Sequence, residues 1–153
     1  MTREEIIQRT AEYVKGEFAR DSSGHDWWHI VRVWKTALAL CNQEGADVYT
    51  VELAALLHDL DDWKLARWPS PPTPLPVGEG RPARAEAWLR QMGVDPALAE
   101  HVCEIITGLS FKGALVETPM RTIEGQIVQD ADRLDAIGAI GIARAFAYGG
   151  HKG

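Results

Sequence analysis

Cysteine is scarce in this sequence. Among 153 residues only Cys41 and Cys103 occur, and each stands at an apolar position of a helical pattern. A disulfide framework, or a zinc site built from thiolates, requires a larger set of cysteines at characteristic spacing. We therefore expect two buried free thiols and neither kind of site.

Long apolar runs are also missing. No run approaches the ~20 residues that a helix needs to cross a bilayer. The polar, acidic start Thr2-Arg3-Glu4-Glu5 is unlike a secretory signal. The sequence thus predicts a cytoplasmic protein that does not enter the membrane.

Positive charge is in deficit as well. Lys and Arg number 16 against 22 Asp and Glu, which gives a formal net charge of −6. Broad binding to nucleic acid depends on clustered Lys and Arg that neutralise phosphates, so we expect no stable nucleic-acid partner. A small anionic substrate remains compatible if a metal ion and a few local cations outweigh the overall field. The candidate cations are Lys64, Lys112, Arg133 and Lys152.

The apolar residues that are present recur mostly at helical spacing. With 46% hydrophobic and 25% charged residues, the composition is that of a globular protein, and the length suits one domain over residues 1–153. Start signals at Thr2, Asp26, Asp47 and Asp95, together with apolar periodicity, define the predicted helices. They cover about 3–18, 26–44, 47–58, 83–92, 95–107 and 123–148. The sequence therefore predicts an all-α bundle of about six helices.

Proline is concentrated in one segment. Six of the eight prolines lie in Trp68–Pro82, together with two glycines and no apolar period. This composition predicts a loop of polyproline character at about 68–82. We interpret it as a rim or lid beside an active site, and a proline-motif ligand for another protein is the alternative.

The segment Val51–Lys64 begins as a buried helix and ends in a cluster of polar groups. His58 falls on the packed face of that helix, and Asp59, Asp61 and Asp62 follow within about one turn. Carboxylates so close together repel one another unless a cation lies between them. A core histidine hydrogen-bonded to a solvated acidic helix end is the alternative that this segment alone leaves open.

A second histidine and two distant aspartates favour the metal site. His29 lies in the motif His-x-x-Arg-Val, at the inner edge of the first turn of its helix, and Asp130 and Asp132 lie in Asp-Ala-Asp-Arg-Leu-Asp. Imidazoles together with carboxylates are common ligands of divalent ions. The two aspartates point about 160° apart on a helix, and both faces are apolar, so periodicity does not select between them.

Taken in the order His, then His-Asp, then Asp, these residues resemble those of the HD-domain metal-dependent phosphohydrolases. The similarity covers nearly the whole chain and implies an HD-type helical bundle. It also implies that one divalent ion is held by His29, His58, Asp59 and Asp132. Two nitrogen and two oxygen donors suit manganese first, with cobalt, magnesium, iron or nickel as alternatives, better than closed tetrahedral zinc. For adjacent residues to share an ion, the helix should end or bend at His58.

Further residues are candidates for the chemistry around such an ion. Asp62 follows His58 by one helical turn, so we predict it as the general acid or base, with a solvated helix-end carboxylate as the alternative. The expected substrate-binding residues are Lys64, Lys112, Arg133 and His25. Lys112 lies on a loop that suits a phosphate, and His25 lies in a loop before a helix. For these two, an exposed loop residue without function is the alternative.

The resemblance implies a metal-dependent hydrolase acting on a phosphate ester or anhydride of a nucleotide. Similarity to the smaller bacterial members favours a nucleoside triphosphate split to monophosphate and pyrophosphate. Such proteins usually continue beyond Phe146–Gly153 with further helices, so we expect a short form or a truncated product, with a homodimer as one consequence. The alternatives are a regulatory module that binds metal or nucleotide without turnover, and a helical scaffold that binds neither.

Overall fold

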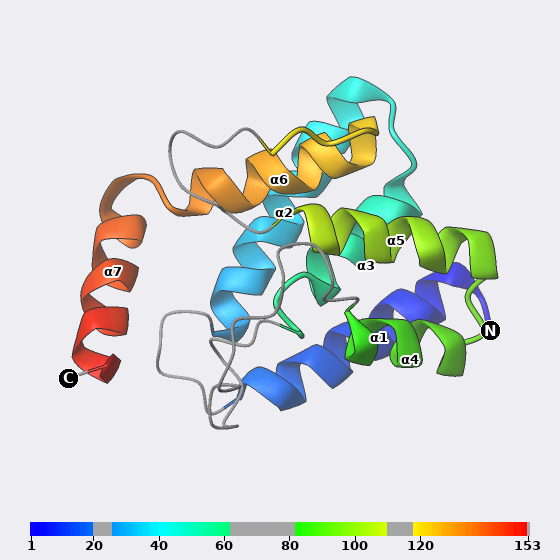
Figure 1. The fold of residues 1–153 in the computed structure, drawn as a ribbon, viewed down its shortest axis with the longest axis horizontal. Helices are drawn as coiled ribbons and strands as arrows, with labels where there is room; N and C mark the ends of the chain where they lie inside the picture. Colours follow the sequence, from blue (N-terminus) through cyan, green and yellow to red (C-terminus); the bar gives the residue numbers. More distant parts are fainter. Residues whose placement is uncertain (20–25, 62–81, 110–117, 153) are drawn as a thin grey trace.

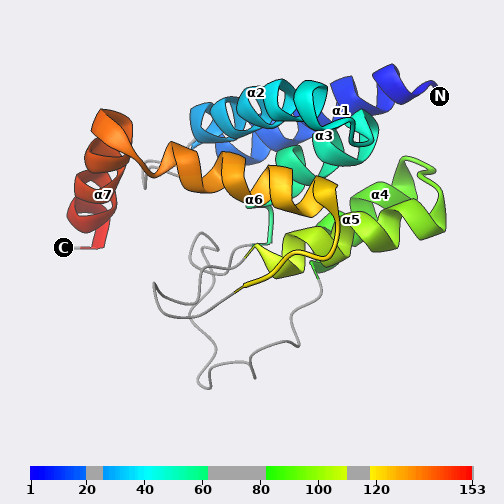
Figure 2. The ribbon, with the colours of Figure 1, turned by 90° about the horizontal axis from the view of Figure 1, so that it is seen from above.

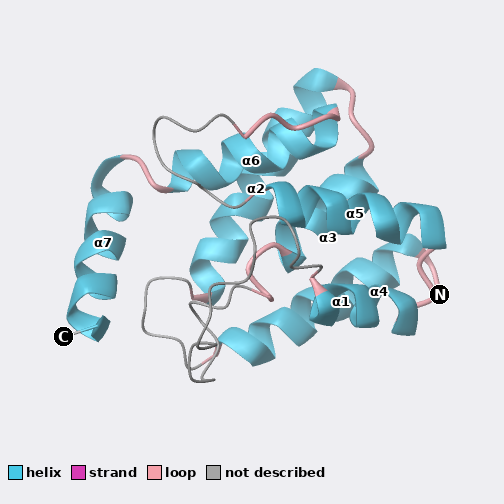
Figure 3. Ribbon diagram, in the orientation of Figure 1, coloured by secondary structure: helices cyan, strands magenta, loops and turns pink. Residues whose placement is uncertain are grey.

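The computed structural model describes residues 1–19, 26–61, 82–109 and 118–152. Within these ranges the chain forms helices joined by loops and no strand (Figure 1, Figure 3), which confirms the predicted all-α class. The helices are α1 (Arg3–Phe18), α2 (Trp27–Glu44), α3 (Val48–Leu57), α4 (Ala83–Gln91), α5 (Pro96–Gly108), α6 (Ile123–Asp135) and α7 (Gly138–Lys152).

Several helices begin at the polar residues that the sequence analysis selected. Thr2 and Glu5 form a reciprocal capping box at the start of α1. The carboxylates of Asp26, Asp47 and Asp95 accept hydrogen bonds from the first-turn backbone of α2, α3 and α5. Each contact satisfies a backbone N–H that has no partner within the helix. The predicted starts of these helices are therefore confirmed.

The core is built around α3 and α2. Eight of the ten residues of α3 are buried, because α1, α2, α5 and α6 all pack against it. Helix α2 packs mainly against α3 and α6, and Figure 2 shows α6 between α2 and α5. Cys41 and Cys103 are buried and free, as predicted. Since α3 is buried along its length, the residues that follow it emerge inside the molecule.

Helix α4 is tied to the rest of the bundle by contacts at both ends. Trp88 stacks on Tyr13 of α1 with ring centroids 4.0 Å apart, and its indole N–H donates to the Thr10 hydroxyl at 3.0 Å. Asp61 accepts from the backbone N–H groups of Arg84 and Ala85, both at 3.0 Å, and so caps a helix that has no cap of its own. The Asp61 carboxylate is thereby engaged with α4.

The last predicted helix is wrong in one respect, because it consists of two helices. Helix α6 ends at Asp135, and α7 begins at Gly138, whose φ of +78° lies in the left-handed region that glycine tolerates. A Cβ on Gly141 would lie 2.1 Å from the Ala136 carbonyl oxygen. The glycines of this segment therefore allow the chain to turn tightly on itself.

Helix α7 stands apart from the other helices in both ribbon views (Figure 1, Figure 2) and packs against α6. Large apolar side chains remain exposed on it, at the adjoining end of α6 and in the turn between the two helices, namely Leu134, Ile137, Ile140, Ile142 and Phe146. We call this set the α7 apolar surface. In the described part of the chain, no helix combines the length and apolar character required to cross a membrane.

Candidate metal centre

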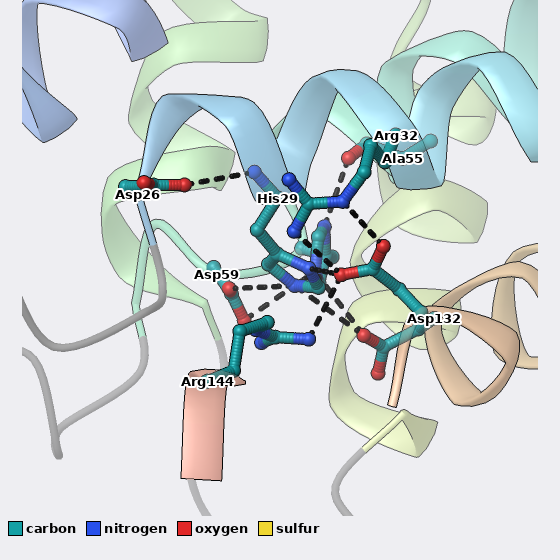
Figure 4. Close-up of polar contacts among 9 residues, drawn as sticks. Asp26, His29, Arg32, Ala55, Asp59, Asp132 and Arg144 are labelled. Carbon is teal, nitrogen blue, oxygen red and sulfur yellow. Dashed lines mark hydrogen bonds and ion pairs between the residues drawn. The ribbon is translucent and has the colours of Figure 1, made fainter. Parts of the chain in front are cut away.

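The first imidazole of the centre is held at the start of α2. Asp26 caps this helix, and its carboxylate accepts the backbone N–H of His29 at 3.0 Å (Figure 4). The cap places His29 in the first turn with its side chain facing inward, and the residue is 0% exposed. A completely buried imidazole requires polar partners, because burying an unsatisfied polar group is costly.

One such partner fixes which ring nitrogen of His29 carries the proton. The Nδ1 atom lies 2.7 Å from Oδ2 of Asp135 on α6. An ionised carboxylate only accepts hydrogen bonds, so Nδ1–H is the donor. In the neutral ring, Nε2 then carries a lone pair on the opposite side, which is the state required of a metal ligand.

The second imidazole follows directly after α3. This helix ends at Leu57, and the Nδ1–H of His58 donates to the backbone carbonyl of Ala55 at 2.8 Å. Its Nε2 atom therefore carries the lone pair as well. The helix ends at the point where the sequence analysis required an ending, so His58 and Asp59 can face the same position.

The Nε2 lone pairs of His29 and His58 are directed at the same position. Nε2 of His29 and Nε2 of His58 lie 3.2 Å apart, and the rings meet edge to face. Because neither neutral nitrogen has a proton to donate, this approach is repulsive unless a positive charge, a proton or a metal ion, is shared between them. The structure therefore places two nitrogen donors at one position, from the start of α2 and the residue that follows α3.

Two carboxylates complete the cluster. Asp59 lies 3.3 Å from Nε2 of His29 and 3.4 Å from Nε2 of His58. Oδ1 of Asp132 lies 3.4 Å and 3.8 Å from the same two atoms, and Figure 4 shows both carboxylates turned toward the imidazoles. One ligand atom from each of His29, His58 and Asp132 lies within 4.8 Å of the others. Two imidazole nitrogens and two carboxylates form a donor set that fits a divalent ion.

The electrostatics of the cluster favour a cation. Burial acts to lower the pKa of His58, but the carboxylates of Asp59 and Asp132 outweigh it and raise the pKa above its ordinary value. The same carboxylates that stabilise a proton on the ring would stabilise a metal ion beside it.

The structure separates the aspartates that the sequence analysis grouped together. Asp130 is exposed on α6, whereas Asp132 lies beside the imidazoles. Asp61 is turned to the start of α4 and takes no part in the cluster. The interpretation that all carboxylates after His58 converge on a cation is therefore wrong for Asp61, because its oxygens satisfy backbone donors of another helix.

The predicted substrate-binding residues are not brought together in the described part of the chain. Arg133 is exposed, and its guanidinium donates to the Thr118 hydroxyl at 2.7 Å. The others lie outside the described residues, as does the predicted general acid or base: His25, Lys64, Lys112 and Asp62.

Three residues near the centre carried no prediction: Asp135, Arg32 and Arg144. Asp135 contacts the ring of His29, while Arg32 and Arg144 contact Asp135. A signal for two of them was available, because Asp135 follows Asp132 by three residues and Arg32 follows His29 by three, so each shares a helix face with a predicted ligand. Arg144 lies beyond the turn at Gly138, and no helical periodicity links it to the ligands.

Known proteins are similar to this chain in sequence and in fold. The family model described as the HD domain matches residues 27–137, a range that includes His29, His58, Asp59 and Asp132. Among curated proteins, YpgQ of Bacillus subtilis is 46% identical over 144 residues, which are 92% of this chain and 65% of YpgQ. The chain thus spans slightly less than two thirds of that relative's length.

Solved structures are similar over almost the whole chain. The crystal structure of Bacillus subtilis YpgQ in complex with ADP is 38% identical with a TM-score of 0.73, covering 99% of this chain and 69% of that one. An HD-superfamily hydrolase from Bacillus thuringiensis is 43% identical with a TM-score of 0.72 and the same coverage of both chains. The fold, the ligand geometry and these similarities agree, and the chain belongs to the HD-domain family.

Proposed function

We propose that this chain is a divalent-metal-dependent phosphohydrolase that acts on a nucleotide. The observation that carries the proposal is the approach of two imidazole Nε2 atoms to 3.2 Å with two carboxylates beside them. Membership of the HD-domain family supports it, and so does an HD-superfamily hydrolase among the similar structures. We also propose that residues 1–153 act as one domain, because the buried apolar residues form one cluster.

The metal ligands in this proposal are His29, His58, Asp59 and Asp132. Manganese is the first candidate, and cobalt, magnesium, iron or nickel are the alternatives. When bound, such an ion polarises a phosphoryl oxygen and lowers the pKa of a coordinated water from about 15.7 toward ~7. The ligand residues contribute by burial, since the two imidazoles and Asp59 are each less than 10% exposed and so keep competing water away.

For the general acid or base and for phosphate binding, we propose the residues that were predicted from the sequence. Asp62 is proposed as the general acid or base, and phosphate binding is assigned to Lys64, Lys112, Arg133 and His25. Arg133 neighbours a proposed ligand, and its exposed guanidinium would exchange the Thr118 hydroxyl for a phosphate oxygen. Charge-assisted contacts of this kind are stronger than neutral ones, which favours the exchange.

The proposed substrate is a nucleoside triphosphate, which would be cleaved to monophosphate and pyrophosphate. The crystal structure of YpgQ in complex with ADP supports a nucleotide ligand for a protein of this type. The position of bond cleavage rests on the resemblance to the smaller bacterial members of the family.

The test is to incubate metal-free protein with a panel of nucleotides and Mn²⁺, Co²⁺ or Mg²⁺, and to follow phosphate and pyrophosphate separately. We expect pyrophosphate release that is lost in Asp59→Ala and retained in Asp130→Ala, a matched control that removes an exposed carboxylate. Metal binding without turnover of any nucleotide would favour the alternative, a regulatory binding module. No metal uptake would favour a plain helical scaffold.

A homodimer is proposed as the state in solution, and the α7 apolar surface supports it. Its five large apolar side chains are about half exposed or more. Exposed apolar patches commonly mark protein contacts. Sedimentation of the parent chain and of Phe146→Ser tests this, since the variant should shift the equilibrium toward monomer.

A further inference from the structure

The carboxylate of Asp135 lies directly behind the metal centre and receives hydrogen bonds from two other helices. On α2, His29 Nδ1 donates at 2.7 Å, and Arg32 donates through Nε at 2.6 Å and through Nη2 at 3.0 Å. On α7, Arg144 Nη1 donates at 2.9 Å. The Asp135 side chain is only 8% exposed, so these contacts form in a largely dry setting.

The arrangement keeps Asp135 ionised. Its two oxygens accept three hydrogen bonds from the guanidinium groups of Arg32 and Arg144, and these positively charged donors stabilise the ionised carboxylate. In turn, the hydrogen bond to Asp135 raises the pKa of Arg32. An ionised carboxylate has no proton to donate, so the proton between Asp135 and His29 belongs to the ring.

Asp135 differs from Asp132 in what its oxygens contact. Asp132 Oδ1 lies close to the Nε2 atoms of both imidazoles. Both oxygens of Asp135 accept from the guanidinium of Arg32, and its contact with the imidazole is on the Nδ1 side. The two carboxylates, one helical turn apart on α6, therefore serve opposite edges of the same ring.

We propose that Asp135 is a positioning residue for the metal centre. It holds the His29 ring in the Nδ1–H tautomer with Nε2 directed at the ion, and Arg32 and Arg144 hold the carboxylate in place. This inference deepens the proposed function and rests on it. Carboxylates that orient ligating histidines in this way raise metal affinity, and their loss typically costs about 10- to 100-fold.

The experiment measures Mn²⁺ affinity and the His29 tautomer separately. Mn²⁺ is titrated into metal-free protein and followed by the electron paramagnetic resonance of the free ion, for the parent, Asp135→Asn and Asp135→Ala. The ring nitrogens of His29 are followed by ¹⁵N NMR in the metal-free proteins, which reports the tautomer without any bound ion. The affinity should fall in the order Asp, Asn, Ala, with a loss of about 10- to 100-fold for Ala.

The matched control is Asp130→Asn, which removes the same charge from an exposed position of the same helix. It should leave both the affinity and the tautomer unchanged. If Asp135→Ala unfolds, Asp135→Asn alone decides, since it keeps the volume of the side chain. The inference is supported if Asp135→Asn weakens Mn²⁺ binding while its melting temperature stays near that of the control.

Two results would overturn the inference. One is equal Mn²⁺ affinity in the parent and in both Asp135 variants. The other is a parent His29 ring that carries its proton on Nε2. If the parent takes up no Mn²⁺ at all, the proposed function fails, and the tautomer measurement then decides on its own whether Asp135 positions the ring.

Discussion

The two imidazoles of the centre present the same atom to the same position but are held by different means. His29 is fixed by the side chain of Asp135, which depends on arginines from α2 and α7. His58 is fixed by the backbone carbonyl of Ala55 in its own helix. A backbone carbonyl is present whatever the side chain is, so substitutions should not remove the support of the His58 ring. A single substitution at Asp135 removes the side chain that holds the His29 ring.

The largest loss of Mn²⁺ binding is expected when either imidazole is removed, because each histidine supplies one nitrogen donor. His29→Ala and His58→Ala each remove one of two nitrogen donors, so both should abolish Mn²⁺ uptake and reduce nucleotide hydrolysis to the rate without protein. Metal content after dialysis and pyrophosphate release measure this. His101→Ala is the matched control, because His101 contacts Thr122 outside the centre. Retained uptake in either ligand variant would contradict the geometry.

A smaller loss of Mn²⁺ affinity is expected when Arg32, which holds Asp135 against the His29 ring, is replaced. Arg32→Ala removes two hydrogen bonds to Asp135 while leaving the contact from Arg144, so Mn²⁺ affinity should fall by up to about tenfold. Titration with Mn²⁺ measures the change, and Arg90→Ala, which removes an exposed arginine on α4, provides the control. An Arg32→Ala affinity equal to that of the parent would mean that Asp135 needs no help to hold its place.

A substitution at Ala55, whose backbone carbonyl supports the His58 ring, should leave the Mn²⁺ affinity unchanged. Ala55→Gly keeps the carbonyl that accepts from His58, but glycine in a buried helix and the lost methyl lower the free energy of unfolding by about 1–2 kcal/mol. Denaturant unfolding measures this cost. The Mn²⁺ affinity of the folded protein should be unchanged, and a marked loss of affinity would show that the carbonyl alone does not hold the ring.

The smallest effect on the centre is expected at Asp61, although it lies only two residues from Asp59. Asp61→Ala removes the cap of α4 and should cost about 1 kcal/mol of stability with no change in Mn²⁺ affinity. Thermal unfolding and metal titration on the same sample separate the two quantities. Weakened Mn²⁺ binding would indicate that Asp61 belongs to the metal cluster after all.

Much of the fold and part of the centre could be predicted from the sequence. Caps such as Asp26 and Asp47 act on their own helix, so local pattern was enough to locate the helix starts. The turn at Gly138 was missed because the apolar pattern continues across it, and glycine alone does not reveal a left-handed φ.

The residues of the metal centre show the same difference between features that local sequence predicts and features that depend on tertiary packing. Periodicity placed His58 on a buried face but could not choose between Asp130 and Asp132, because that choice depends on which face of α6 meets α2 and α3. The pairing of Asp135 with His29 joins residues 106 positions apart, and no local signal reports such a contact. Asp61 shows the opposite case. Its proximity to Asp59 in the sequence suggested a role in the same cluster, but its carboxylate instead accepts hydrogen bonds from the backbone of α4.

A crystal of the protein soaked in Mn²⁺ would test the four-residue metal centre, with diffraction recorded at a wavelength where manganese scatters anomalously. We predict one anomalous peak per chain, within bonding distance of Nε2 of His29, Nε2 of His58 and the carboxylates of Asp59 and Asp132. A peak elsewhere, or no peak in a crystal whose four side chains keep the present arrangement, would contradict it.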